Sequence, residues 1–158
     1  MLATKPVDLT LAIQKATEGF TIILGRPTDN DLIEIQQILV PVLMKTTYNE
    51  LILKQNVSGV ILPAERYERI YKNGAYVIPP VIPLYDENID KDSTRVEINR
   101  AEGKNEARQN GRQLYKTSNN ACCSFIMAVV EETWYKELEY PDTFYTKVTA
   151  IKLLDHLT

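Results

Sequence analysis

Apolar residues recur every three or four positions between residues 29 and 42, the first clear periodicity along the chain. They are Leu32, Ile35, Ile38, Leu39 and Val42. This spacing places them on one face of an α-helix. Thr28 or Asp29 can cap that helix, because a side-chain oxygen there can accept a hydrogen bond from the first turn. Pro41 lies inside the pattern, and an internal proline costs a helix roughly 3 kcal/mol, so a kink or break is expected near Val40.

Prolines and glycines mark a second helix and the segment after it. Pro63 suits the first position of a short helix over residues 64–71, and Asn73–Gly74 suits its end. Residues 77–83 read Val-Ile-Pro-Pro-Val-Ile-Pro. Each proline fixes its own φ and biases the preceding residue away from helix. An extended apolar strap or linker is therefore expected there.

Residues 86–118 are strongly polar. Ser93 could cap a helix in this stretch, but Gly103 and Gly111 would each cost it about 1 kcal/mol relative to alanine. The pattern predicts either a partly solvated helix or a linker.

Apolar side chains dominate the chain from Ala121. The pattern predicts a helix over residues 121–138, capped by Asn119 or Asn120 and buried on more than one side. Its second half would be amphipathic, with apolar residues on one stripe at Trp134 and Leu138.

A last helix is expected from about Thr149, because four apolar residues follow at helical spacing: Ile151, Leu153, Leu154 and Leu157. Its apolar face is unfinished at Thr158, so the chain is expected to be truncated at its C-terminus. Residues 1–24 show no clean period. Residues 20–24 have strand-like composition but stop at Gly25, so residues 1–24 are expected to form an arm of uncertain order.

These elements predict an all-α or mainly α protein, a small helical bundle with long irregular segments punctuated by proline. Residues 25–158 would form the helical region. The length of 158 residues, with 44% apolar and 25% charged residues, is that of a globular domain with a core of its own.

The net charge of −3 does not favour nucleic-acid binding by this chain alone, because phosphate binding usually requires a basic face. The longest apolar run, ten residues from Ala121, is shorter than the roughly 20 that a membrane helix needs. The only two cysteines are adjacent, and adjacent cysteines rarely form a disulfide with each other. A reducing, cytoplasmic setting is therefore expected.

Catalytic and metal-binding patterns were sought, and none is complete. His156 lies more than thirty residues from the cysteine pair, too few ligands for a zinc site. Cys122 and Cys123 stand in an apolar stretch, where thiols are usually inert. The triplet at residues 92–94 lacks the glycine of an aspartic-protease loop and suits a helix cap. The expectation is a non-enzyme with no cofactor, no metal and no small-molecule substrate.

Four short segments carry a likeness to a known family. They are Gly-Arg-Pro-Thr at 25–28, Gly-Val-Ile-Leu-Pro-Ala-Glu-Arg-Tyr at 59–67, Tyr-Val-Ile-Pro-Pro-Val-Ile-Pro at 76–83, and Val-Thr-Ala-Ile-Lys-Leu-Leu-Asp-His-Leu at 148–157. In this order they resemble the N-terminal, capsid-start part of Gag from copia-type long-terminal-repeat retrotransposons. No Cys-Cys-His-Cys zinc knuckle follows.

The resemblance implies a structural role, in which subunits self-associate through helical faces into a capsid-like shell around the RNA of the element. RNA would be bound only by regions absent from this chain. Eight apolar residues are the candidates for core packing or for subunit contact, with Trp134→Ala expected to weaken association: Phe125, Ile126, Val129, Val130, Trp134, Leu153, Leu154 and Leu157. The alternatives are a cellular helical protein–protein interaction module and a non-functional fragment of a decayed element.

Overall fold

The computed structural model of the chain describes residues 6–47, 55–71, 76–79 and 94–158. Within these ranges the fold is mainly helical, as the sequence predicts, and no strand is formed. The α-helices in chain order are α1 (Pro6–Ala16), α2 (Asp29–Met44), α3 (Ala64–Tyr71), α4 (Arg95–Val129) and α5 (Ala150–Leu157). Three short 3₁₀ turns join them: η1 (Val57–Val60), η2 (Glu132–Trp134) and η3 (Lys136–Leu138).

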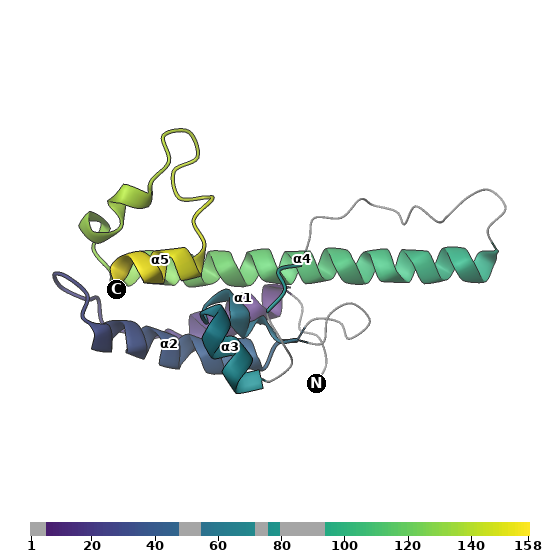
Figure 1. Cartoon of the computed structure of the whole chain (residues 1–158), viewed down its shortest axis with the longest axis horizontal. Helices are drawn as coiled ribbons and strands as arrows, with labels where there is room; N and C mark the ends of the chain where they lie inside the picture. The colour runs from purple at the N-terminus through teal and green to yellow at the C-terminus, as the bar shows by residue number, and fades with distance from the viewer. Residues whose placement is uncertain (1–5, 48–54, 72–75, 80–93) are drawn as a thin grey trace.

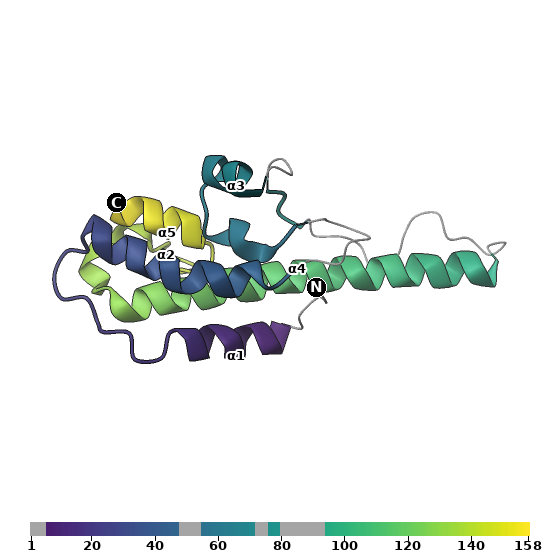
Figure 2. The same cartoon turned by 90° about the horizontal axis from the view of Figure 1, so that it is seen from below.

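Helix α4 is the longest element and organises the molecule (Figures 1 and 2). Its 35 residues span about 50 Å at 1.5 Å per residue. The C-terminal half packs against α1, α2, η1 and α5. The N-terminal part extends past the other helices, and no residue from Arg95 to Glu106 is buried. The molecule is therefore a helical body with one projecting arm, which we define as residues 95–106.

The core forms where α1 and α2 meet the C-terminal half of α4. Helix α1 lies in the stretch before Gly25, where the sequence showed no clean period, and it buries Leu9 and Ile13. Helix α2 buries its predicted face through Leu32, Ile35 and Leu39, together with Leu43. Full burial of a leucine or isoleucine side chain contributes about 1.5–3 kcal/mol. These side chains hold α1 and α2 on the same body.

The start of α2 confirms the predicted cap. The Thr28 side chain accepts a hydrogen bond from the Asp31 backbone, and the Asp31 carboxylate accepts one from the Thr28 backbone. Of the two predictions near Val40, the break is wrong, because the helix continues through Pro41 to Met44, and the kink stays a prediction. Proline leaves the carbonyl of the residue four positions earlier, Gln37, without its helical donor. Gln37 is exposed, so water can bond that carbonyl at little cost.

The short helix predicted over residues 64–71 is confirmed as α3. Asn73–Gly74, its predicted end, lies outside the described residues, as do residues 80–83 of the proline strap. The first part of the strap, residues 76–79, is neither helix nor strand. The Gln55 side-chain amide donates to the Val77 carbonyl at 2.5 Å and accepts from the Val77 N–H at 3.1 Å. Arg112 of α4 donates to the Pro79 carbonyl at 2.7 Å.

The predicted boundaries of the long helix are wrong at both ends. Helix α4 begins 26 residues before Ala121, with Thr94 rather than Ser93 as its cap. Asn119 and Asn120 lie inside it and cap nothing on it. The face that α4 buries is made partly of Ala107, Gly111 and Ser118. From Arg95 on, the polar stretch forms the partly solvated helix that was one of the two predictions for it. Its continuity with the apolar stretch was not predicted, because small and polar residues give no hydrophobic periodicity.

Helix α4 ends at Val129, nine residues before the predicted end. The Val129 carbonyl accepts a hydrogen bond from the Ile23 backbone at 2.7 Å, and Val130 is extended. Trp134 and Leu138 consequently lie in the successive 3₁₀ turns η2 and η3, not on one helical stripe as predicted. The last residue of α4 is therefore hydrogen-bonded to Ile23, a residue distant in the sequence.

Asn119 joins α4 to the start of α5. Its side-chain oxygen accepts a hydrogen bond from the Ala150 backbone at 2.9 Å, while Thr149 caps the Lys152 backbone at 3.2 Å. The predicted start of this helix near Thr149 is confirmed. Two side chains therefore satisfy donors of the first turn of α5, which would otherwise lack partners.

Substitution of Gly59 tests its close contact with the ring of Tyr76. A Cβ built on Gly59 would overlap the ring of Tyr76, whereas nothing lies within 4 Å of one built on Gly103. Gly59→Ala should lower the free energy of unfolding by about 1–3 kcal/mol, as overpacking does. Gly103→Ala should instead raise it by up to about 1 kcal/mol, because alanine favours helix. Urea unfolding of both variants checks this, and equal shifts would contradict it.

Asn119 and its neighbour Asn120 form a matched pair for the start of α5. Asn119→Ala removes the acceptor of the Ala150 N–H and should cost about 0.5–2 kcal/mol of unfolding free energy. Asn120 is exposed on the same helix, so Asn120→Ala should leave stability within about 0.5 kcal/mol. Thermal or urea unfolding of the two variants decides the point. The contact has no energetic role if both variants unfold alike.

Candidate assembly surface

The eight candidates for core packing or subunit contact lie in or against the core. Phe125 and Trp134 are partly buried against it, and the other six are at most 5% exposed: Ile126, Val129, Val130, Leu153, Leu154 and Leu157. Ile126 and Leu153 each lose almost all contact with solvent, at 0% and 1% exposure. Substitutions at these positions would lower the stability of the fold, so they would not isolate an effect on subunit contact.

Cys122 and Cys123 are buried free thiols of α4. Burial raises the pKa of the Cys123 thiol to about 12, and burial followed by the proximity of Cys123 raises the pKa of Cys122. The Cys123 Sγ lies 3.5 Å from the Val148 carbonyl, which its thiol can contact as a weak donor. Both thiols stay protonated at neutral pH, and a protonated thiol is a poor nucleophile. They fill space in the core.

His156 lies on α5 next to a small mixed-charge pocket. Its Nε2 is 3.8 Å from a Glu137 carboxylate oxygen, and Arg26 and Trp134 also line the pocket of about 270 Å³. The buried Trp134 indole N–H has no hydrogen-bond acceptor among the described residues. Across the described ranges, no three His, Cys, Asp or Glu side chains come close enough together to hold a metal ion. His156 therefore lies beside the Glu137 carboxylate and forms no metal-binding cluster with the described cysteines.

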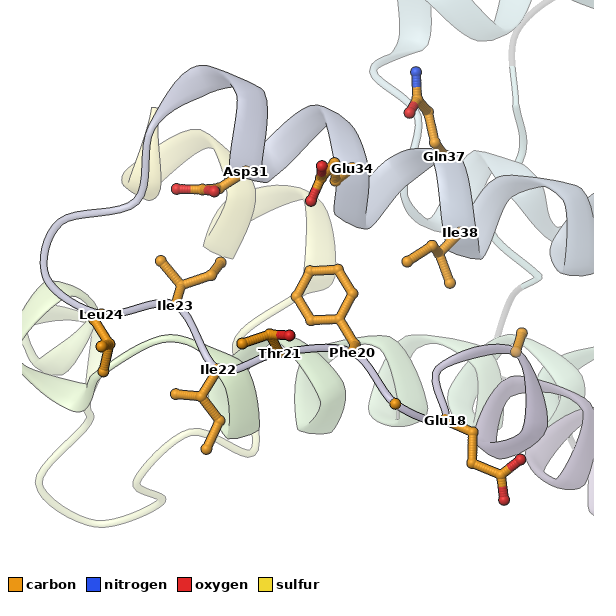
Figure 3. Close-up of a pocket in the computed structure, with 12 residues that line it drawn as sticks. Glu18, Phe20, Thr21, Ile22, Ile23, Leu24, Asp31, Glu34, Gln37 and Ile38 are labelled. Carbon is orange, nitrogen blue, oxygen red and sulfur yellow. The ribbon is translucent and has the colours of Figure 1, made fainter.

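A groove lies between α2 and the segment that leads from α1 to α2 (Figure 3). It measures about 720 Å³. One side is formed by residues 16–24 and the other by the outer face of α2, from Asp31 to Ile38. Figure 3 shows Phe20 and Ile23 pointing toward α2, with Glu34 and Ile38 facing them. We call this cavity the α2 groove.

The floor of the α2 groove is apolar and is fixed to the body from behind. The Phe20 ring meets Phe125 of α4 edge-on, with centroids 5.2 Å apart. Ile23 is bonded through its N–H to Val129, and the Gly25 N–H donates to a Glu131 carboxylate oxygen at 2.7 Å. Residues 20–24 had strand-like composition, yet they pair with no strand among the described residues. They instead run along the end of α4.

Apolar side chains remain exposed beside the groove. Ile22 is 59% exposed and Leu24 86%, and both lie on the segment that lines the groove. Isolated exposed apolar residues are ordinary, but a contiguous group next to a groove is typical of an interaction surface. The sequence search did not single out these residues as a contact surface, although the unpaired strand-like run ending at Gly25 was the available signal.

The polar lining of the α2 groove carries one sign of charge. Glu18, Asp31 and Glu34 line it, and none of its twelve lining residues is Lys, Arg or His. Asp31 is occupied by the capping box of α2, whereas Glu18 and Glu34 are exposed and make no ion pair in the described part of the chain. The groove can therefore bind a surface that combines apolar and cationic side chains.

Comparisons with known proteins return no match: no family model, no curated protein and no solved structure is similar to this chain. In the part of the chain that the structure describes, no helix is both long and apolar enough to cross a bilayer.

The buried thiols predict a loss of stability at high pH. Since their pKa values are raised in the folded state, unfolded chains release the thiol protons from about pH 9 while folded chains keep them. The stabilising contribution is therefore complete below pH 9 and is lost as pH rises toward 12. The free energy of unfolding should fall more steeply between pH 8 and 10.5 for the native chain than for a Cys122→Ala/Cys123→Ala variant. An equal pH dependence of the unfolding free energy in the two proteins would show that folding does not raise the thiol pKa values.

Proposed function

We propose that this chain is a Gag-like structural protein of a retrotransposon that self-associates into a capsid-like shell and catalyses no reaction. The four sequence segments that resemble copia-type Gag suggest the family. The helical fold is compatible with it, and the buried, protonated thiols remove the strongest candidate nucleophiles. RNA of the element would be held by regions other than this chain, and the setting would be the cytoplasm, where unpaired cysteines persist.

One observation carries the self-association part of this proposal. The α2 groove is an apolar cavity of about 720 Å³ with exposed isoleucine and leucine side chains beside it. A surface of this kind gains free energy, about 25 cal/mol for each Å² of apolar area, when another protein covers it. The contact surface of the proposal is therefore this groove, and Phe125 and Val129 of α4 support its floor from behind.

A cellular interaction module would use the same groove for a different protein. The two functions differ in what the purified chain does by itself. A Gag-like subunit associates with its own copies, whereas an interaction module stays monomeric until its partner is added. A decayed fragment would lack a cooperative unfolding transition altogether.

Sedimentation velocity over a hundredfold range of protein concentration tests the proposal. The sedimentation coefficient should rise with concentration at moderate salt. The variant Ile22→Ser/Leu24→Ser removes apolar surface at two exposed positions and should weaken association. Its unfolding free energy should stay within about 0.5 kcal/mol of the native value, which separates lost contact from lost folding. A coefficient that stays monomeric at all concentrations would refute self-association and leave the interaction module.

A further inference from the structure

A row of positive charge begins on the projecting arm and ends just beyond it. Arg100, Lys104 and Arg108 follow one another at intervals of four residues on α4. At 3.6 residues per turn they fall within an arc of about 80°. The acidic residues Glu102 and Glu106 fall about 160° from Lys104, on the opposite side of the helix. Glu97, three residues before Arg100, lies on the same face as these cations, and its carboxylate accepts a hydrogen bond from the Thr94 backbone. We call the first three residues the basic ridge.

Among the described residues, no salt bridge is formed by the three cations of the basic ridge. Arg100 and Lys104 are exposed, Arg108 is half-buried, and the ion pair found there joins His156 and Glu137 instead. Like charges four residues apart on a helix repel each other by about 0.2–0.5 kcal/mol. Covering the ridge with carboxylates would relieve this repulsion. The ridge therefore favours an acidic surface as its neighbour.

The α2 groove offers such a surface at the other end of the molecule. Glu18 and Glu34 are exposed carboxylates at its rim, and no cation lines it. Figures 1 and 2 show the start of α2 and the segment before it at the end where α4 finishes, while the arm extends from the opposite end. One molecule cannot bring its own arm to its own groove, because α4 is a continuous helix that holds the two ends apart. A second copy can.

We propose that the chain associates head to tail, with the basic ridge of one copy seated on the acidic rim of the α2 groove of the next. This inference rests on the proposed self-association and names its contact. Val96, which is 64% exposed on the arm, would cover part of the apolar floor. Where each copy gives its ridge to one neighbour and its groove to another, the contact repeats from copy to copy and forms a ring or an open filament.

Charge reversal tests the contact. Arg100→Glu/Lys104→Glu, the arm variant, and Glu18→Lys/Glu34→Lys, the groove variant, should each raise the concentration needed for association at least about tenfold, because attraction is replaced by repulsion. Asp31 is left unchanged because it caps α2. Sedimentation velocity at about 50 mM salt gives the readout, and raising the salt should weaken association of the native chain.

Two combinations separate the contact from general charge or folding effects. The chain that carries all four substitutions has the native net charge. Its two surfaces are again opposite in charge, with the signs exchanged, so its association should return. An equimolar mixture of the arm and groove variants should also associate, since each supplies a surface that fits the other. Matched controls alter the charge elsewhere by the same amount: Lys136→Glu/Lys147→Glu for the arm variant, and Glu68→Lys/Asp142→Lys for the groove variant.

The outcomes distinguish this inference from the proposed function. If the native chain associates and the arm and groove variants match their controls, the head-to-tail contact is refuted while self-association stands. If the variants lose association but neither combination restores it, the contact is likewise refuted. If the native chain stays monomeric at every concentration, both proposals fail together.

Discussion

Burial of one face of α4 is the constraint on which the rest of the molecule depends. Leu114, Cys122 and Ile126 on this helix are fully shielded from solvent, and α1, α2, η1 and α5 all pack against it. No shorter helix here could bury its own apolar face alone, because isolated helices of 8–16 residues are marginal in water. The bundle exists because α4 provides a common surface.

The same helix separates two surfaces of opposite character. Its C-terminal end supports the apolar floor of the α2 groove through Phe125 and Val129, while its N-terminal end carries Arg100 and Lys104 into solvent. Because α4 is one continuous helix, the distance between the groove and the ridge is set by the helical rise of 1.5 Å per residue. The two ends of the long axis therefore carry different surfaces, one apolar and acidic and the other basic.

Some elements could be derived from local chemistry. Thr28 and Asp31 form a capping box because both partners lie within one turn, and the apolar spacing of α2 needs no distant contact to be recognised. Pro63 followed by residues 64–71 behaves likewise. The extent of α4 could not be derived in this way. Its buried face uses Ala107, Gly111 and Ser118, whose burial is a property of the helices beside them.

The sequence by itself determined the helical fold class, the apolar face of α2, and the starts of α2, α3 and α5, because caps and periodicity act over a few residues. Only the tertiary structure decided that α4 continues from Arg95 to Val129, and that Asn119 satisfies the start of α5. It alone placed the eight candidates in or against the core and brought residues 20–24 and α2 together around a groove. Those outcomes depend on partners distant in the chain, which no local pattern encodes.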